Sequence, residues 1–340
     1  MQFACSQNKF QQKDGKTIMI KYVIKRILLM LMVFLIITSV CFILVKLLPT
    51  TEAQQFGKDQ AIIEMRREKL GYNKPILVQY GIFLGNAMRG DFGKSYFYNQ
   101  PALKVIQEKL PATLELVFVT MILTILVGIP LGVFAGAYPK KITSKLTMTT
   151  SIFGVSLPSF WVGMILIYVF SLAMGLTPIS GRGEVGEIFG IKTSLATLDG
   201  WHHLILPAIT LALSNVASII RLTRAGTQEQ MRQDYVKFAR SKGVSNRSVL
   251  FGHALKNSLI PVITILGLQL GDLIAFTTIT ETIFAWPGMG KMALDAISKN
   301  DRPIISAYLL MVSALFIVIN FIVDVLYTLI DPRISLGDED

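Results

Sequence analysis

The sequence predicts an all-α membrane protein with six transmembrane helices, and three observations lead to that prediction. Hydrophobic residues make up 52% of the 340 residues, charged residues only 16%, and the mean hydropathy is +0.54. This composition is too apolar for a typical soluble domain. Six apolar stretches are long enough to cross a bilayer. A basic, amphipathic segment at 233–261 lies between the fourth and the fifth stretch.

The chain starts with residues 1–18, which are polar, contain several lysines and lack the apolar core of a signal peptide. We expect an uncleaved extension without regular structure. The first span is predicted at 27–48, because its residues, at about 1.5 Å each, reach about 33 Å. Residues 49–110 mix charged and aromatic groups and are expected to form an external loop of short helices, so that 19–111 make one unit.

The second span is predicted at 112–138 and carries Gly128, Gly132 and Gly136 at every fourth position. Small residues at this spacing share one helix face and let another backbone approach closely, which drives helix association in lipid. Pro130 is expected to kink the same helix.

The remaining spans are predicted at 151–176, 204–220, 257–285 and 303–330. The third contains Pro158, and the fifth contains Gly267 and Gly271, which are candidates for close helix packing. An even number of spans places both ends of the chain on one side of the membrane. We expect 112–334 to form a five-helix core and 335–340 a short tail.

Lysine and arginine in the short loops indicate which side that is. Lys140, Lys141 and Lys145 lie between the second and third spans, and eight Lys or Arg residues lie in 221–256. The short loops on the other side carry fewer, two in 177–203 and three in 286–302. The loop 221–256 and both termini are therefore expected in the cytoplasm.

The basic segment begins with a predicted amphipathic helix. Tyr235, Phe238 and Ala239 fall on one helical face, while Lys237 and Arg240 fall on the other. This pattern predicts a short helix at the membrane surface with an apolar stripe.

A turn and a second helix are predicted to follow. Gly243 can adopt the left-handed conformation that ends a helix, and Ser245 is placed to cap the next helix, which runs toward His253 and Leu255. The segment is thus expected to be a helix–turn–helix.

At these residues the segment resembles the cytoplasmic coupling loop of ABC importer permeases, whose pattern is Glu-Ala-Ala, three residues, Gly, and later Ile-x-Leu-Pro. Three positions match it: Ala239, Gly243 and Leu255. Four depart from it in the way usual for the peptide and nickel importer subfamily: Lys237, Phe238, His253 and Lys256. The resemblance covers nearly all of 19–334, through the motifs GDFGKS at 90–95, LPATLEL at 110–116, SLPSFW at 156–161, ETIFAWPGMG at 281–290 and LYTLIDPRI at 326–334.

The resemblance implies one permease subunit of a type I, binding-protein-dependent ABC importer in the bacterial cytoplasmic membrane. It implies a second, similar permease, two cytoplasmic ATPases that bind ATP and Mg²⁺, an external binding protein and a di- or oligopeptide cargo. Import of nickel or a metal chelate is the alternative, because the same motifs occur in those permeases. No cofactor is expected in this chain, and no nucleic acid partner.

Enzymatic sites are not indicated by the sequence. The GKS at 93–95 lacks the glycine that a phosphate loop needs five residues earlier, where Met88 stands. His202, His203 and His253 have no metal-ligand spacing. An intramembrane enzyme, which would need paired catalytic groups at one depth, is therefore disfavoured.

Polar residues within apolar spans are the candidates for the substrate pathway, because a charge at the bilayer centre costs about 2.5–3.5 kcal/mol on insertion scales. Asp272 is the sharpest case, with Gln269 three residues before it and Glu281 near the external end. Pairing of Asp272 with a partner helix remains open beside contact with cargo. Trp161, like Trp201 and Trp286, is a candidate for a pore wall or an interfacial anchor.

Overall fold

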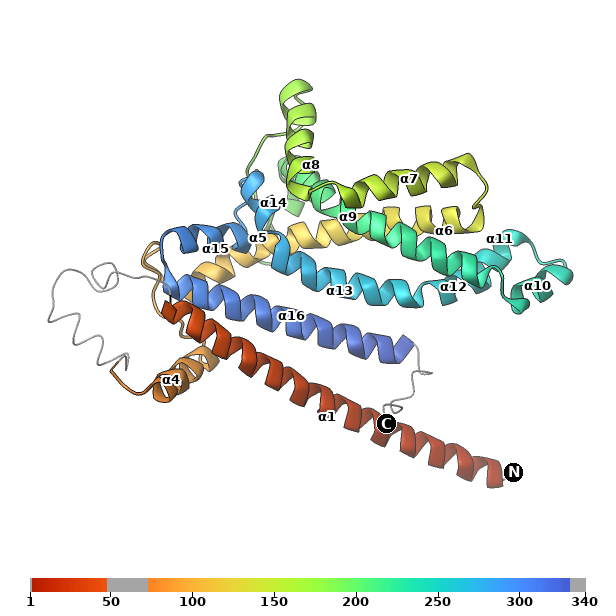
Figure 1. Cartoon of the computed structure of the whole chain (residues 1–340), viewed down its shortest axis with the longest axis horizontal. Coiled ribbons are helices and arrows are strands. Elements are labelled where there is room, and N and C mark those ends of the chain that lie inside the picture. Colours follow the sequence, from red (N-terminus) through yellow and green to blue (C-terminus); the bar gives the residue numbers. More distant parts are fainter. Residues whose placement is uncertain (1, 48–72, 331–340) are drawn as a thin grey trace.

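The computed structural model describes residues 2–47 and 73–330, and its helices form one elongated bundle (Figure 1). Five helices are long and apolar enough to cross a membrane, and a bent helix pair makes a sixth candidate. The all-α prediction is therefore confirmed, with one small exception within these residues, a two-stranded hairpin. The predicted tail 335–340 and the loop residues 49–72 lie outside the described residues.

The first span belongs to helix α1 (Gln2–Leu47), whose apolar part is Ile24–Leu47. The extension 1–18 was expected to lack regular structure, but from Gln2 it continues the helix, which is a correction. The sequence contains no proline before Pro49, so nothing stops the helix once the span has formed. Helix α4 (Ile76–Met88) lies near the C-terminal end of α1, where the hydroxyls of Tyr80 and Thr38 form a hydrogen bond at 2.9 Å.

The second span is longer than predicted and runs from Ala102 to Ala137. It consists of α5 (Ala102–Leu123), a π-helical turn η1 (Thr124–Gly128) and α6 (Ile129–Ala137). The expected boundary at 111 falls inside α5, because Ala102, Val105 and Ile106 are buried against α15 and α16 and hold the first turns in helix. The irregularity expected at Pro130 appears as the π turn just before it.

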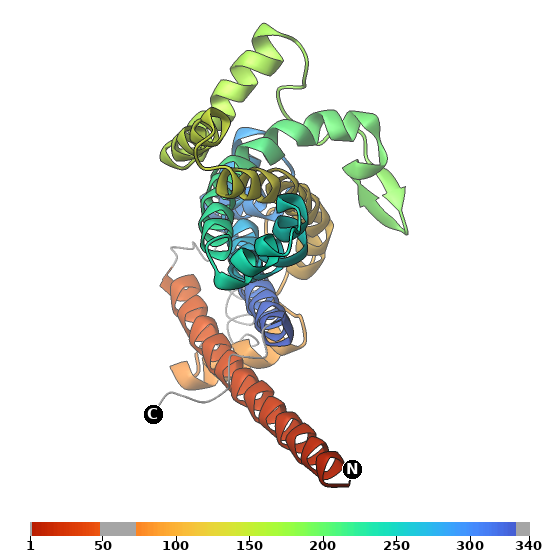
Figure 2. The ribbon, with the colours of Figure 1, turned by 90° about the vertical axis from the view of Figure 1, so that its right-hand side faces the viewer.

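The third span is not one straight helix. It divides into α7 (Ile142–Ser156) and α8 (Ser159–Leu166), continued by the π-helical η2 (Ile167–Ala173), and the two halves are bent by 106°. Leu157 before Pro158 is extended, as the proline ring requires. Helix α8 consequently projects from the bundle, and the hairpin of β1 (Gly186–Ile188) and β2 (Ile191–Thr193) projects in another direction (Figures 1 and 2).

The fourth span is the long helix α9 (Leu198–Gln230), which the sequence predicted only at 204–220. It begins after the short 3₁₀ turn η3 (Ser194–Ala196), and the Thr197 side chain caps its first turn. Residues 221–230 were expected in the loop but continue the helix, because Thr223 and Thr227 pack against Gly132 and Gly136 of the second span. A Cβ at Gly132 or Gly136 would lie 2.6 Å from the Cβ of these threonines, and Gly128 faces Ile219.

The fifth span runs through α12 (Leu255–Ser258) and α13 (Ile260–Phe276), and α14 (Thr278–Ile283) follows after a break at Thr277. The sixth is α16 (Arg302–Ile330), close to its predicted bounds. Gly267 and Gly271 let α13 lie against Val323 and Phe316 of α16. Helix α15 (Met289–Ser298) connects α14 to α16 at the end of the bundle where α4 also lies (Figure 1).

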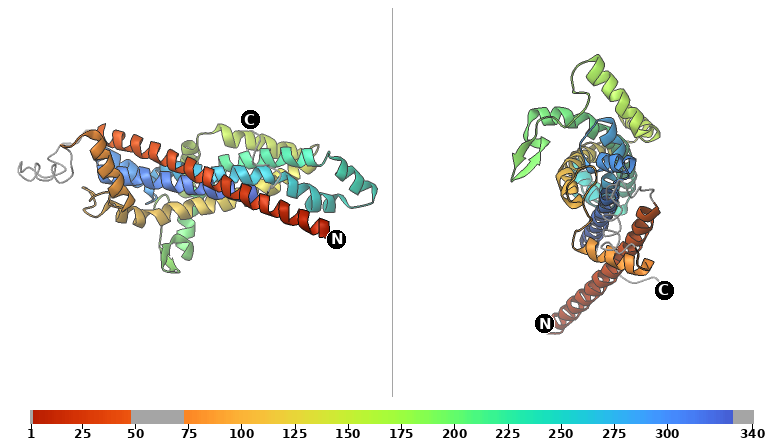
Figure 3. Two further views of the ribbon diagram at one scale, coloured as in Figure 1. Left: turned by 90° about the horizontal axis from the view of Figure 1, so that it is seen from below. Right: turned by 90° about the vertical axis from the view of Figure 1, so that its left-hand side faces the viewer.

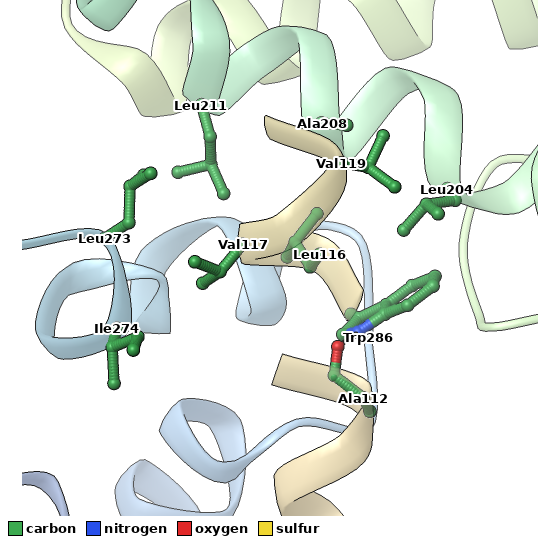
Figure 4. Packing of buried hydrophobic residues seen from close by; sticks show 10 residues of the cluster. All are labelled: Ala112, Leu116, Val117, Val119, Leu204, Ala208, Leu211, Leu273, Ile274 and Trp286. Carbon is green, nitrogen blue, oxygen red and sulfur yellow. Dashed lines mark hydrogen bonds between the residues drawn. The ribbon is translucent and has the colours of Figure 1, made fainter. Parts of the chain in front are cut away.

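One residue of the core lies where three helices meet. Trp286 is fully buried among α5, α9 and α13, and its Nε1 donates to the Ala112 carbonyl at 2.8 Å (Figure 4). It is therefore a core residue, whereas an interfacial anchor was the expected role.

The N-terminal end of α1, the far end of α16 and helices α10 and α11 all lie toward one end of the bundle, and α4 and α15 lie at the other (Figures 1 and 3).

Candidate functional site

The basic segment folds into the predicted helix–turn–helix. Helix α10 (Asp234–Ser241) follows α9 after a short link, and the Tyr235 hydroxyl donates to Gln230 Oε1 at 2.8 Å. The Lys237 ammonium donates to Asp234 at 2.8 Å and lowers the pKa of that carboxyl below its usual value. Val236, which the sequence interpretation did not single out, is the fully buried residue of α10.

The other apolar side chains of this helix point outward. Phe238 is 62% exposed and Tyr235 38% exposed, and Ala239 is half-buried. Val244 and Phe251, which follow in the turn and the second helix, are also exposed. An exposed apolar surface on a charged helix at the end of a bundle is typical of a protein-binding surface.

The backbone conformation explains why residue 243 is a glycine. Its φ is +79°, the Gly243 amide donates to the Arg240 carbonyl at 2.9 Å, and the Val244 amide donates to the Ala239 carbonyl at 3.2 Å. This double closure is the Schellman motif, which requires a left-handed residue after the helix. Ser245 then caps α11 (Asn246–Val249) by accepting from the Ser248 amide at 3.3 Å.

The second helix is fixed to the bundle. It continues from α11 through the π-helical η4 (Leu250–Ala254), which contains His253, into α12, which begins at Leu255. Leu250 and Ala254 are buried with Val133 of α6, and Leu255 packs against the same cluster. The Arg240 Nε donates to Asn246 Oδ1 at 3.0 Å, so the two helices of the segment are joined directly. Helix α10 is thus linked to α6 through α11 and η4.

At the opposite end, Glu281 is fully buried in α14, beyond the end of the spanning segment. Its Oε1 accepts from the hydroxyls of Thr113, at 2.7 Å, and Thr277, at 3.1 Å, and its Oε2 accepts from the Lys291 amide at 2.9 Å. Burial raises the pKa of this carboxyl, against the hydrogen bonds that favour its charged form. Glu281 was a candidate for the substrate pathway, but here it joins α5, α14 and α15.

The ETIFAWPGMG motif builds this arrangement. A Cβ at Gly288 would lie 2.3 Å from the Glu281 carboxylate, and a Cβ at Gly290 would lie 2.4 Å from Thr278 Oγ1. Both positions therefore exclude a side chain as long as Glu281 keeps its place. Thr113 completes the network, since its Oγ1 also accepts from the Met289 amide at 2.8 Å.

A second buried carboxylate, Glu115, holds the β1–β2 hairpin. Glu115 of α5 accepts from Arg182 Nε at 2.5 Å, from the Thr193 hydroxyl at 2.7 Å and from the Ser194 amide at 2.9 Å. The exposed tip of the hairpin, with Phe189, is thus carried on a base that is fixed to the second span.

The remaining pathway candidates do not gather at one point. Asp272 is exposed on α13 and forms no hydrogen bond or ion pair with the residues described. Gln269 is half-buried one turn before it, and its Oε1 has no hydrogen-bond partner in the described part of the chain. Trp161 lies on the projecting helix α8 and is 44% exposed.

Comparisons with known proteins place the chain in a family. Residues 128–336 match the family described as "Binding-protein-dependent transport system inner membrane component", and residues 19–117 match its N-terminal counterpart, "Binding-prot-dependent transport system membrane comp, N-term". The chain is 39% identical over 332 residues to the di/tripeptide transport system permease protein DppB of Pseudomonas aeruginosa, covering 93% of this chain and 99% of the relative. It is 35% identical to the glutathione transport system permease protein GsiC of Escherichia coli K12, again with 93% and 99% covered.

A further relative is the dipeptide transport system permease protein DppB of Alkalihalophilus pseudofirmus, at 36% identity, with 93% of this chain and 100% of the relative covered. Among solved structures, a chain of the inward-facing MetNI methionine ABC transporter aligns with a TM-score of 0.53 at 14% identity, covering 67% of this chain and 97% of that chain. This likeness shows the type I importer permease fold. The chain therefore belongs to the family of inner membrane components of binding-protein-dependent transport systems.

Proposed function

We propose that this chain is one of two permease subunits of an ABC importer that moves di- or oligopeptides into the bacterial cytoplasm. A peptide cargo is supported by the relatives described above. They cover over nine-tenths of the chain and are named for di/tripeptide, dipeptide and glutathione transport. These names favour peptides over nickel. A second, similar permease would complete the pathway, and an external binding protein would deliver the cargo.

The orientation follows from charge and geometry together. Lysine and arginine concentrate at the end of the bundle that carries α10, α11 and the start of α1 (Figure 1), and positive charges favour the cytoplasmic side. Both termini and the helix–turn–helix are therefore cytoplasmic in this proposal. ATP and Mg²⁺ are bound by two ATPase subunits at that side, and this chain contributes no nucleotide site.

Coupling is proposed to act through α10. Phe238 and Tyr235 enter a groove of the ATPase, while Val236 and the cluster around Leu250 stay fixed in the bundle. Closure of the ATPases on ATP then moves α10, and the buried contacts transmit the movement to α6, α9 and α13. The spans rock from inward-open to outward-open, which is a rigid-body transition of packed helices.

The experiment is uptake of radiolabelled dialanine by cells that express the whole transporter, compared with cells that lack only this subunit. Uptake that depends on this chain supports the proposal. Uptake of ⁶³Ni²⁺ that depends on this chain, with no dialanine uptake, would replace peptide by metal as the cargo. Phe238→Asp is the matched variant for coupling, because Phe238 is exposed and its loss leaves the bundle intact; we expect it to abolish uptake at normal abundance of the subunit.

A further inference from the structure

Asp272 lies on an apolar helix face that no described part of this chain covers. Leu268 and Phe276 are four residues before and after it, and both are exposed, at 45% and 74%. Leu266, Leu273 and Ile274 face the bundle and are buried. Asp272 precedes the helix end at Phe276 by four residues, about 6 Å. The carboxylate is thus inside the span, in its outer third.

A carboxylate at this place cannot face lipid at low cost. Charged groups within spans face water or protein, because the hydrocarbon offers neither counterion nor hydrogen bonds. Asp272 has no partner among the described residues, whereas Glu115 and Glu281 on the same half of the molecule accept three or more hydrogen bonds each. It is also not needed for packing, since α13 meets α16 through Gly267 and Gly271.

The chemistry of its neighbour indicates a ligand. Gln269, three residues earlier, is a neighbour of Asp272 on the helix; its side chain is half-buried, and its Oε1 is a buried acceptor without a donor in the described part of the chain. Two acceptors, one of them charged, suit a group with one positive charge and several N–H donors. Hard divalent ions prefer six or more oxygen ligands, which this pair does not supply.

We propose that Asp272, assisted by Gln269, accepts the α-ammonium group of a peptide as the cargo passes the outer third of the membrane. The inference rests on the proposed function, since peptides with a free amino terminus carry this ammonium group. The carboxylate bears the charge and Gln269 accepts a second hydrogen bond. The apolar residues Leu268 and Phe276 on either side exclude water and strengthen the ion pair.

The test uses the assembled complex of both permeases and both ATPases in nanodiscs without the binding protein, so that selectivity of the binding protein does not enter. Binding of labelled dialanine is compared with that of N-acetyldialanine, which lacks the ammonium group. We expect at least a tenfold preference for dialanine in the wild type and in Asp272→Glu. Asp272→Asn should reduce the preference to less than twofold, and Gln269→Leu should reduce it partly. Asp295→Asn, which replaces a half-buried carboxylate of α15 that pairs with Lys291 at 3.5 Å, is the control.

Each outcome decides the matter. Loss of the preference in Asp272→Asn with normal co-purification of the second permease supports the proposal. An unchanged preference overturns it. Loss of the second permease from the purified Asp272→Asn complex overturns it too, because the carboxylate would then pair with a cation of that subunit. Failure of the proposed function is recognised separately, because wild-type cells would then show no uptake of dialanine.

Discussion

Replacement of Glu281 tests whether a buried hydrogen-bond network holds the external ends of α5, α14 and α15 together. Glu281→Ala would leave the amides of Lys291 and Gly290, which now donate to the carboxylate, without an acceptor in a dry site. A buried group that loses its partner costs about 1–3 kcal/mol, so these two amides alone cost about 2–6 kcal/mol. The global free energy of unfolding of a domain is about 5–15 kcal/mol, and the loss would consume a large part of it.

Glu281→Gln should cost much less, for a reason visible in the donors. The two backbone amides can only donate, so the glutamine carbonyl must take the place of Oε2. The glutamine NH₂ then faces Thr113 and Thr277, whose hydroxyl oxygens can accept. Thr113 already accepts from the Met289 amide and keeps a second lone pair. We expect a loss of about 1 kcal/mol.

The measurement is the unfolding free energy of the purified subunit in mixed micelles, by titration with denaturing detergent, together with abundance in the membrane. Glu187→Gln on the exposed hairpin is the control and should change neither. The pKa of Glu281 is raised by burial, so the folded state keeps this proton to higher pH than the unfolded state. Stability should therefore fall as the pH rises above the ordinary value near 4.5 and level off above the raised pKa, and this slope should vanish in Glu281→Gln. Equal stability of the Ala and Gln variants would refute the reasoning.

Three further predictions address other parts of the molecule. The added side chain of Gly243→Val meets no atom within 4 Å, but the residue must adopt a φ of +79°, which costs about 1–2 kcal/mol. Uptake should therefore fall at normal abundance of the subunit, whereas Gly243→Asn should retain uptake. Full uptake by Gly243→Val would remove the coupling role. Gly136→Val would place its Cβ 2.6 Å from Thr227 Cβ and 2.8 Å from the Arg224 carbonyl oxygen. We expect it to lower the free energy of unfolding by about 1–3 kcal/mol in the same detergent titration. Gly85→Ala is the control, because a Cβ there meets no atom within 4 Å. Single cysteines are introduced at exposed positions on a background without Cys5 and Cys41. Cysteines at Thr143 and Ser245 should react with a membrane-impermeant thiol reagent only in opened cells, while cysteines at Ser180 and Ser298 should react in intact spheroplasts. The reverse pattern would mean that the chain has the opposite orientation in the membrane.

The number and order of the spans could be predicted because hydropathy reports membrane depth directly. Their ends could be predicted only where a breaker coincides with the membrane surface. Pro303 stands at the start of α16, and the predicted and observed helices agree there within one residue. Helix α9 has no such breaker, so it continues to Gln230 through residues that are polar by composition but packed against the glycines of the second span. Hydropathy cannot distinguish a helix that leaves the membrane from a loop.

The turn of the coupling segment was predictable for a local reason. A glycine after an amphipathic stretch and a serine two residues later determine the Schellman motif and the cap within six residues of sequence. The direction of the side chains was not predictable in the same way. Periodicity groups Tyr235, Phe238 and Ala239, yet the bundle buries Val236 instead, because the angle at which α10 leaves α9 decides which face meets the bundle.

Glu281 and Asp272 show why polar residues in apolar segments are ambiguous in sequence, since the first is buried and the second is exposed. Glu281 and Asp272 both lie within 257–285 and both satisfied the criterion for a pathway residue. What separates them is three-dimensional: Thr113 comes from a helix more than 160 positions earlier, and the Lys291 amide comes from the turn after the motif. Glu281 is enclosed because glycines at 288 and 290 leave room for its carboxylate. Among the described residues, Asp272 has neither donors nor a glycine cradle around it, so its charge is available to a molecule that is not part of this chain.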